Sequence, residues 1–185
     1  MEQKQKIVNL LNERAQSLGT EAVSLDNVVD TISNTMPSSD ISPETYLGTE
    51  RGEQPTNTSN LCSNNVCTYT ESKTVSQDDY ALSGMWKRSP EFISLESSTG
   101  SLSYKFHAKK VHLVASALNL TTAMIYIDGK PITSHQSGRD VINGKVSIGK
   151  ATLYTLVDLG DSAETHTLEV QFIGQGAQVY TLTFS

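Results

Sequence analysis

Two cysteines lie close together in the sequence, and their spacing is the first feature that could carry chemistry. Cys62 and Cys67 enclose four residues with Asn64-Asn65 at the centre, which fits a tight turn closed by a structural disulfide. Free thiols are one alternative, and a redox or metal role is another. The redox role is disfavoured because redox-active pairs are separated by two residues and hold a thiolate at a helix N-terminus. A metal site would need further ligands, and no histidine is near these cysteines in the sequence.

Histidine and glutamate side chains are the other candidates for catalysis or metal binding. His107 and His112 flank a short turn and could bind a metal together with an aspartate if they faced each other across a hairpin. The favoured alternative is that they are hydrogen-bonded or exposed histidines at strand ends. Glu44, Glu50 and Glu53 are clustered, but only the fold can place two carboxylates across a cleft for glycoside hydrolysis. The sequence contains no nucleophile elbow, phosphate-binding glycine loop or helical zinc motif, so we expect no catalysis, metal or cofactor in this chain.

A binding role is better supported by the residue types. Sugar-binding β-proteins place a flat aromatic ring against the apolar side of a sugar and use amide, carboxylate and arginine groups to hold its hydroxyls. Trp86, the single tryptophan, is the candidate platform, with Arg139, Asp140 and Tyr154 as polar partners. The alternatives are that Trp86 fills the core and that Arg139-Asp140 is an exposed loop salt bridge, which would contribute little stability. Arg51 and Glu53 have a similar pair of interpretations: a charged pair that anchors the first segment of the domain, or a polar site.

The elements that position these residues are predicted to be strands. From residue 43 onwards, apolar residues alternate with polar ones, as in Leu102, Tyr104 and Phe106 or Leu168, Val170 and Phe172. Turn signals separate the strands: Ser98-Thr99-Gly100, Asp128-Gly129, Asn143-Gly144 and Gly174-Gln175-Gly176. The pattern predicts an all-β domain over 43–185, an antiparallel β-sandwich with a jelly roll as the first choice and an open barrel as the alternative.

The N-terminal residues have a different pattern. Ile7, Leu10, Leu11, Ala15 and Leu18 recur at helical spacing, which predicts a helix over 1–20. Residues 21–42 form the predicted linker, which contains a second short apolar stretch of helical spacing from 25 to 32. Because a short helix with one apolar stripe is marginal in isolation, we expect it to pack on a neighbouring domain.

The composition excludes several classes of partner. The formal net charge is −6 and the chain has no stripe of lysine and arginine, so a nucleic-acid partner is not expected. No apolar run approaches the roughly 20 residues that span a bilayer, so we expect no membrane insertion by this segment. Charged residues make up only 18% of the chain, while Ser, Thr, Asn and Gln are abundant, a composition typical of extracytoplasmic β-proteins.

Short motifs follow one another in order from residue 42 to 185. They are Pro43-Glu44-Thr45-Tyr46-Leu47-Gly48 with Arg51 and Glu53, Ala81-Leu82-Ser83-Gly84-Met85-Trp86, Tyr104-Lys105-Phe106-His107-Ala108, Val111 to Val114, Ile127-Asp128-Gly129-Lys130-Pro131, Leu153-Tyr154-Thr155-Leu156-Val157, His166-Thr167-Leu168-Glu169-Val170 and Ala177-Gln178-Val179-Tyr180-Thr181-Leu182-Thr183-Phe184. Together they resemble the C-terminal domain of DipZ-type proteins, which is similar to carbohydrate-binding modules. The order and spacing of these motifs carry the resemblance, not any one of them alone.

The resemblance implies a membrane-anchored thiol-disulfide interchange protein, with a thioredoxin-like domain in the periplasm or cell envelope followed by this sandwich. The helix over 1–20 would then be the last helix of the thioredoxin-like domain.

The implied function is a non-catalytic accessory domain that binds a glycan or an envelope protein client. The alternative is an interaction module that packs on the redox domain, with Glu44, Tyr46, Arg51 and Glu53 at the interface. A third hypothesis makes Cys62 and Cys67 an auxiliary electron relay. The redox cysteines expected of a thioredoxin-like domain are absent from this sequence.

Overall fold

The computed structural model describes residues 41–57, 62–72 and 74–185. The chain divides into two units, residues 1–40 and residues 41–185, and the described residues all belong to the second. The predicted helix over 1–20 lies outside the described residues, as does the predicted linker up to residue 40. Within the described part, the secondary structure consists of thirteen strands without a helix, so no helix there could cross a membrane.

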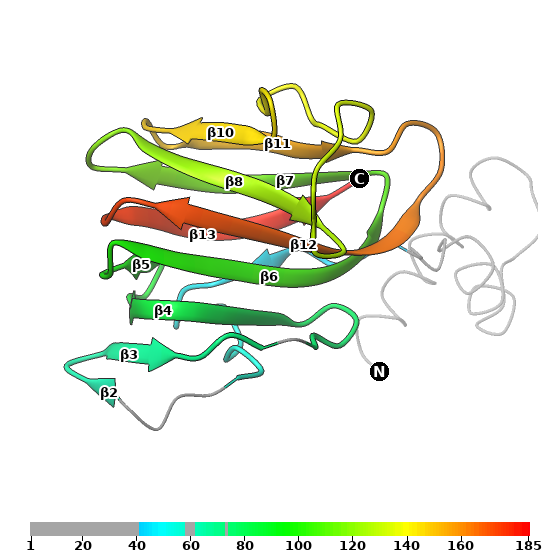
Figure 1. Cartoon of the computed structure of the whole chain (residues 1–185). Helices are drawn as coiled ribbons and strands as arrows, with labels where there is room; N and C mark the ends of the chain where they lie inside the picture. Colours follow the sequence, from blue (N-terminus) through cyan, green and yellow to red (C-terminus); the bar gives the residue numbers. More distant parts are fainter. Residues whose placement is uncertain (1–40, 58–61, 73) are drawn as a thin grey trace, which may run out of the picture. The chain divides into compact units, whose positions relative to one another are not determined.

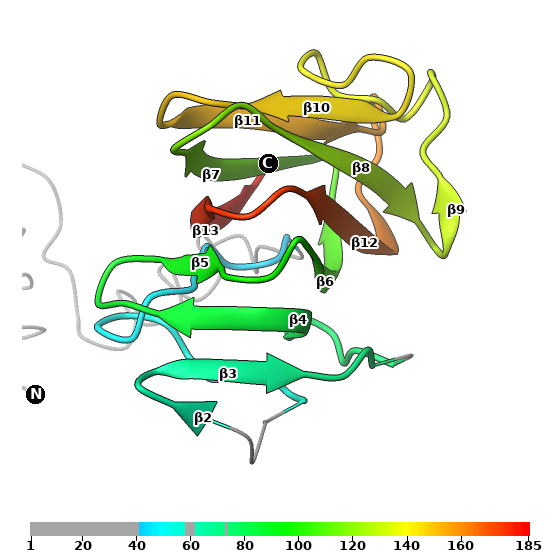
Figure 2. The same ribbon diagram turned by 60° about the vertical axis from the view of Figure 1, so that its left-hand side comes forward.

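The strands of the described residues form one continuous antiparallel sheet, which folds over at β4 into two layers. The layers lie one behind the other in Figure 1, and Figure 2 shows them turned by 60°. The first layer has the order β10-β8-β12-β6-β4, with the short strand β9 beside β8. Its strands are β4 (Tyr80–Arg88), β6 (Thr99–Ala108), β8 (Thr121–Ile127), β9 (Lys130–Pro131), β10 (Lys145–Ile148) and β12 (Glu164–Ile173).

The second layer has the order β5-β13-β7-β11, and its short strand β1 pairs with β13. The second half of β4, together with β3 and β2, extends this layer beyond β5. Its strands are β1 (Thr45–Tyr46), β2 (Cys62–Ser63), β3 (Val66–Tyr69), β5 (Ile93–Leu95), β7 (Lys110–Ala117), β11 (Thr152–Asp158) and β13 (Ala177–Phe184).

Strand β4 connects the two layers. Its first residues, Tyr80 to Ser83, pair with β6, whereas its last residues, Trp86 to Arg88, pair with β5. The change of partner occurs around Gly84, whose φ of 91° is unfavourable for residues with a side chain. The two layers confirm the predicted antiparallel β-sandwich, and the jelly-roll order stays a prediction.

One apolar core fills the space between the layers, and the alternation seen in the sequence explains it. In β6, Leu102, Tyr104 and Phe106 are buried, while Ser103 and Lys105 are only half-buried. Side chains from the strands of both layers join one continuous cluster of buried residues. The period of two therefore identifies which side of each long strand faces the core.

Two predicted turns adopt the backbone expected for tight hairpins. Asp128-Gly129 and Asn143-Gly144 each combine φ values of 51° and 74°, as a two-residue type I′ turn requires. The predicted turn Ser98-Thr99-Gly100 is wrong in part, because Thr99 and Gly100 are already the first residues of β6 and pair with β12. Gly100 is needed there for packing: an added Cβ would lie 2.5 Å from Cδ1 of Leu95.

Candidate functional site

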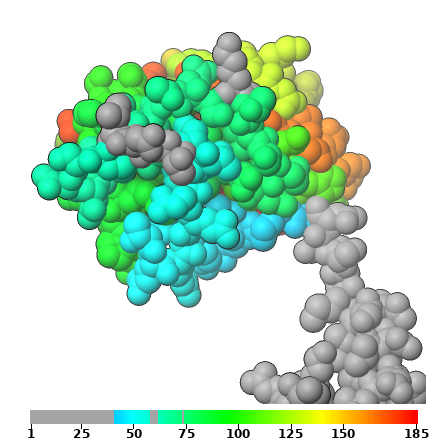
Figure 3. Space-filling view, turned by 90° about the horizontal axis from the view of Figure 1, so that it is seen from below, coloured from blue at the N-terminus to red at the C-terminus, as the bar shows by residue number. Residues whose placement is uncertain are grey.

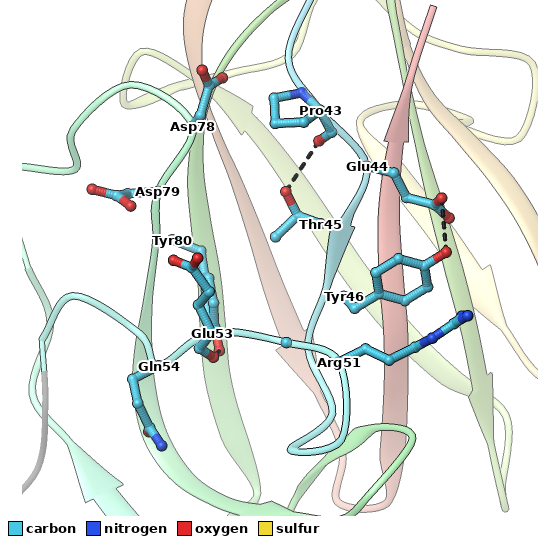
Figure 4. Close-up of a pocket in the computed structure, with 11 residues that line it drawn as sticks. Pro43, Glu44, Thr45, Tyr46, Arg51, Glu53, Gln54, Asp78, Asp79 and Tyr80 are labelled. Atoms are coloured by element: carbon cyan, nitrogen blue, oxygen red, sulfur yellow. Dashed lines mark hydrogen bonds between the residues drawn. The ribbon is translucent and has the colours of Figure 1, made fainter. Parts of the chain in front are cut away.

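The first described segment of the chain folds over the sandwich and forms a pocket of about 210 Å³. Figure 4 shows this pocket, and Figure 3 shows the same segment in cyan on the molecular surface. The pocket brings all four predicted interface residues together with two aspartates from the chain before β4. Its lining residues are Pro43, Glu44, Thr45, Tyr46, Arg51, Gly52, Glu53, Gln54, Asp78, Asp79 and Tyr80.

Tyr46 is the centre of one side of the pocket. Its hydroxyl donates a hydrogen bond of 2.8 Å to Oε2 of Glu44, and the guanidinium carbon of Arg51 lies 4.8 Å from the centre of its ring. The hydrogen bond to Glu44 stabilises the protonated phenol and raises the pKa of Tyr46 above its ordinary value. The short distance between Arg51 and the Tyr46 ring is a cation–π contact. In Figure 4 the Arg51 guanidinium points away from Glu53.

Glu53 anchors the segment through its backbone, not through its carboxylate. Its carbonyl oxygen accepts hydrogen bonds from the hydroxyl of Tyr80 at 2.9 Å and from Nη2 of Arg88 at 2.7 Å. Burial raises the pKa of Tyr80 to about 12, so its hydroxyl stays a donor at neutral pH. The predicted anchoring role therefore falls to Tyr80 and Arg88, and the Glu53 side chain lines the pocket.

Two glycines allow the segment to turn sharply at the edge of the pocket. The amide of Gly52 donates to the carbonyl of Gly48 at 2.9 Å. A Cβ added to Gly52 would lie 2.1 Å from the carbonyl oxygen of Tyr46, and one added to Gly48 would lie 2.2 Å from that of Pro90. No side chain fits at either position, so the turn that places Arg51 depends on glycine.

The opposite side of the pocket carries Asp78 and Asp79, which sequence reasoning missed. The Ser42 hydroxyl donates to Asp78, as does the Gln77 side-chain amide at 2.8 Å, while the Ser42 oxygen accepts from the amide of His107 at 2.8 Å. Nothing in the local sequence could have predicted this, because the aspartates reach the pocket through long-range contacts. The lining thus holds four carboxylates and one arginine, an arrangement suited to a polar partner that carries charges of both signs.

The candidate sugar platform, Trp86, is corrected by the structure. Its side chain is fully buried, its Nε1 donates to the carbonyl of Ser83 at 2.7 Å, and its ring meets Phe172 edge to face. The indole has no exposed face on which a sugar could stack. Its position is that of the alternative prediction, in which the tryptophan fills the core.

The other three candidate sugar-binding residues lie away from the pocket and contact local backbone. The Tyr154 hydroxyl, in a buried side chain, accepts from the amide of Gly149 and donates to the carbonyl of Lys150, both at 3.0 Å. Oδ2 of Asp140 accepts from the amide of Thr155 at 2.7 Å and lies 3.5 Å from Nε of the exposed Arg139. These contacts fix loops and strand β11, and the structure does not assemble the three with Trp86 into one site.

The cysteine pair forms a disulfide that closes a two-strand hairpin. Cys62 in β2 and Cys67 in β3 face each other in the antiparallel register and are bonded. Asn64 and Asn65 form the turn, with φ values of 51° and 64° that asparagine tolerates better than most residues. This is the geometry of the structural disulfide that the spacing favours.

The two histidines are separated into different layers, which corrects the idea that they face each other across a hairpin. His107 is the penultimate residue of β6 in the first layer, and its Nδ1 lies 2.8 Å from Oγ1 of Thr165. His112 belongs to β7 in the second layer, with Nδ1 3.1 Å from Oγ1 of Thr155. No group of three or more His, Cys, Asp or Glu side chains in the described part of the chain could hold a metal ion.

Comparison with known proteins identifies the family. The family model for the thioredoxin-like C-terminal domain matches residues 42–185, which is most of the chain. The chain belongs to this family. The match covers the same residues as the ordered motifs, so the resemblance is confirmed at the level of the thioredoxin-like C-terminal domain.

Comparisons beyond the family give weaker likenesses. No protein with a curated description matches the chain. Among solved structures, a family two carbohydrate esterase from Clostridium thermocellum in complex with cellohexaose is similar at 14% identity and a TM-score of 0.46, covering 57% of this chain. An active-site mutant of a family two carbohydrate esterase from the same organism gives 15% identity and a TM-score of 0.44 over the same share. The similar region spans only 31% of each esterase.

Proposed function

We propose that this thioredoxin-like C-terminal domain is a non-catalytic accessory module of a DipZ-type thiol-disulfide interchange protein outside the cytoplasm. In this proposal the parent protein is membrane-anchored, and the jelly-roll sandwich packs on its thioredoxin-like domain through the pocket of Glu44, Tyr46, Arg51 and Glu53. Family membership supports the context, because the matching family is described as the thioredoxin-like C-terminal domain.

The position of the pocket carries the proposal. It is built from residues 43–54, directly after the start of the described unit at Ile41. In this proposal the thioredoxin-like domain precedes the predicted linker, and tethering through that linker raises its effective concentration at the pocket. A weak contact with this pocket is enough to hold two tethered domains together.

The groups of the pocket suit a polar protein surface better than a reaction. The Glu44 carboxylate is engaged by the Tyr46 hydroxyl, and Asp78 is engaged by Ser42 and Gln77. Arg51 stacks on the Tyr46 ring and presents an exposed cation beside these acids. Charged groups of both signs at the edge of a contact mainly determine orientation and partner choice, which is the role of a positioning domain.

A glycan or client protein is the second candidate ligand. The observation that favours a glycan is the half-exposed ring of Tyr46 between a carboxylate and an arginine, because these group types hold sugar hydroxyls and stack on sugar rings. The fully buried Trp86 removes the larger aromatic platform.

Nuclear magnetic resonance titration of the full chain tests the proposal. Adding the thioredoxin-like domain of the parent protein should shift the amide signals of residues 43–54, and Arg51→Glu should weaken the complex about tenfold. Arg139→Glu makes the same charge change in an exposed loop away from the pocket and is the matched control. Signals that shift only elsewhere, or equal weakening by both variants, would contradict the interface.

A glycan array on the same chain separates the two candidates. The decisive result is a glycan that binds to the chain, loses its binding in Tyr46→Ala and keeps it in Arg139→Glu. This result would favour sugar recognition over packing on the thioredoxin-like domain as the function of the pocket. Absence of glycan binding together with shifts on adding the redox domain supports the packing role.

A further inference from the structure

Arg88 is a buried cation whose hydrogen bonding is incomplete. Its side chain projects from the end of β4, and the residue is only 8% exposed. Among the buried side-chain nitrogen and oxygen atoms of residues 41–57, 62–72 and 74–185, all have a hydrogen-bond partner except Nε of Arg88. Buried donors without a partner are rare in folded proteins, and each one calls for an explanation.

The charge of Arg88 is also unmatched. Nη2 donates to two backbone carbonyls, that of Glu53 at 2.7 Å and that of Leu47 at 3.5 Å. The ion pairs found in the described residues are formed by other side chains, and none includes Arg88. Because a buried charge is costly unless an opposite charge is near, this guanidinium is a site at which an anion would be stabilised.

Arg88 lines a second pocket beside the segment of residues 43–54, which shares Gln54 with the pocket of Tyr46. It has a volume of about 750 Å³ and lies between this segment and the β2–β3 hairpin, which is teal in Figure 3. None of the described residues that line it is an aspartate or a glutamate, although the chain carries a net charge of −6. The lining residues are Thr49, Gln54, Cys62, Asn64, Asn65, Cys67, Tyr69, Arg88 and Pro90.

Local structure holds the amide groups of this pocket in place. The disulfide between Cys62 and Cys67 closes the hairpin, and the backbone amide of Arg88 donates to the carbonyl of Asn65 at 3.1 Å. The side chains of Asn64 and Asn65 therefore stand on a turn that is fixed at both ends. Side-chain amides are good hydrogen-bond donors to carboxylate oxygens, and rigid placement lowers the entropy that binding would cost.

We propose that this pocket binds a carboxylate group, with Arg88 supplying the compensating charge and the Asn64, Asn65 and Gln54 amides supplying hydrogen bonds. A small movement of the pocket wall brings a carboxylate oxygen to Nε of Arg88, which completes its hydrogen bonding. The inference does not depend on the packing role of the other pocket. The carboxylate belongs either to an acidic sugar or to an acidic peptide side chain, since both present the same group.

The Nε–Hε signal of Arg88 in the full chain is the direct readout. D-Glucuronate or an aspartate-containing tripeptide with an acetylated N-terminus and an amidated C-terminus, added up to about 10 mM, should shift this signal and the amide signals of residues 64 and 65. D-Glucose and the same capped tripeptide with asparagine in place of aspartate are the uncharged controls and should leave the signals unchanged. The acid that gives the larger shift identifies the source of the carboxylate, and Arg139 provides an internal reference signal.

Two charge-matched variants test the electrostatic argument without removing Arg88 from the fold. Asn65→Asp places a negative charge on the wall of the pocket and should weaken carboxylate binding about tenfold or more. Asn119→Asp adds the same charge at an exposed position away from this pocket and should change the affinity less than twofold. Arg88→Lys keeps the charge and loses the planar fork, so it should reduce but not abolish binding.

Three outcomes would overturn the proposal. The first is that neither acid shifts the Nε–Hε signal of Arg88. The second is that the uncharged controls shift it equally, and the third is that Asn65→Asp and Asn119→Asp weaken binding to the same extent.

Discussion

Single residues determine whether the N-terminal segment can form its pocket. Gly48 and Gly52 occupy positions where any Cβ would overlap a backbone carbonyl. Tyr80 and Arg88 donate hydrogen bonds to the carbonyl oxygen of Glu53. The contacts of Gly48, Tyr80 and Arg88 join the segment to residues far away along the chain, whereas Gly52 packs on Tyr46 within the segment. The pocket therefore depends on a few exact packing contacts, whereas the polar side chains that line it are mostly exposed.

Gly52→Ala should destabilise the domain by about 2 kcal/mol or more, because the added methyl group must displace the backbone at Tyr46. Chemical denaturation of the purified variant measures the change in the free energy of unfolding. Gly149→Ala is the matched control: its nearest atom would be Cδ1 of Leu120 at 3.5 Å, an ordinary contact, so a change below about 1 kcal/mol is expected. Equal effects of the two substitutions would contradict the steric argument.

His166 gives the fold a dependence on pH. Nδ1 lies 2.6 Å from Oδ2 of Asp128 and Nε2 lies 3.1 Å from Oε2 of Glu164. Burial lowers the pKa of His166, but the hydrogen bonds and charges of the two acids outweigh it, so the pKa is raised. Burial likewise raises the pKa of Asp128, but the Thr167 amide and His166 outweigh it, so that pKa is lowered.

The pair should stabilise the fold most between pH 3.8 and pH 6.5, which are the ordinary pKa values of Asp128 and His166. The His166 contribution is complete below 6.5 and is lost as pH rises through its raised pKa; the Asp128 contribution is lost as pH falls through its lowered pKa. The gain should be under about 1 kcal/mol, because Asp128 is partly exposed. In Asp128→Asn the pKa of His166, followed by magnetic resonance, should fall; an unchanged value would exclude the pair as its cause.

Among the elements, the β2–β3 hairpin and strand β4 serve different purposes. The hairpin extends the second layer beyond β4 and is closed by the disulfide. It forms a wall of the Arg88 pocket and contributes Tyr69 to the core. Strand β4 joins both layers and carries Trp86 into the core and Arg88 to the segment above it. Its alternation alone could not predict this, because the strand changes its partners at Gly84.

Replacing Cys62 and Cys67 together by serine should lower the stability of the domain by about 2 kcal/mol, as expected for closing a loop of this length in the unfolded chain. Denaturation of the variant and of the parent chain, each with and without reductant, measures the effect. Reductant should lower the stability of the parent chain and leave the variant unchanged. A loss of the whole β-sheet signal would contradict a local role for the hairpin.

Trp86 should report the state of the core, because it is fully buried and contacts Phe172. Its fluorescence should resist quenching by acrylamide in the native chain and shift to longer wavelength in one step on unfolding. Neutral sugars should leave the native emission unchanged. A sugar that quenches or shifts it in the folded chain would contradict the core assignment.

At the scale of the whole molecule, the described unit begins at Ile41. Its core is one cluster of buried side chains that includes both Leu47, near the start of the unit, and Leu182, near its end. The family match starts at residue 42, within one residue of the start of this unit, and the sequence predicts the start of the sandwich at residue 43. The first strand, β1, pairs with the last, β13, which ties the two ends of the unit together.

A chain that begins at Ile41 should therefore unfold cooperatively, with a midpoint within about 3 °C of the full chain. A chain that begins at Thr49 removes β1 and the fully buried Leu47 and should lose at least about 2–5 kcal/mol. Differential scanning calorimetry of both chains measures the difference. If the chain that begins at Ile41 were clearly less stable than the full chain, residues 1–40 would be part of the fold.

The sequence by itself determined the class of fold, the turns at Asp128-Gly129 and Asn143-Gly144, and the family, because these depend on alternation and turn chemistry between near neighbours. It also singled out Glu44, Tyr46, Arg51 and Glu53, which the pocket brings together. Only the tertiary structure decided which side chains meet across the fold. Trp86 points into the core, Asp78 and Asp79 join the pocket, and Arg88 is buried beside a wall without acids. These outcomes follow from strand pairing over long distances, which a local pattern does not specify.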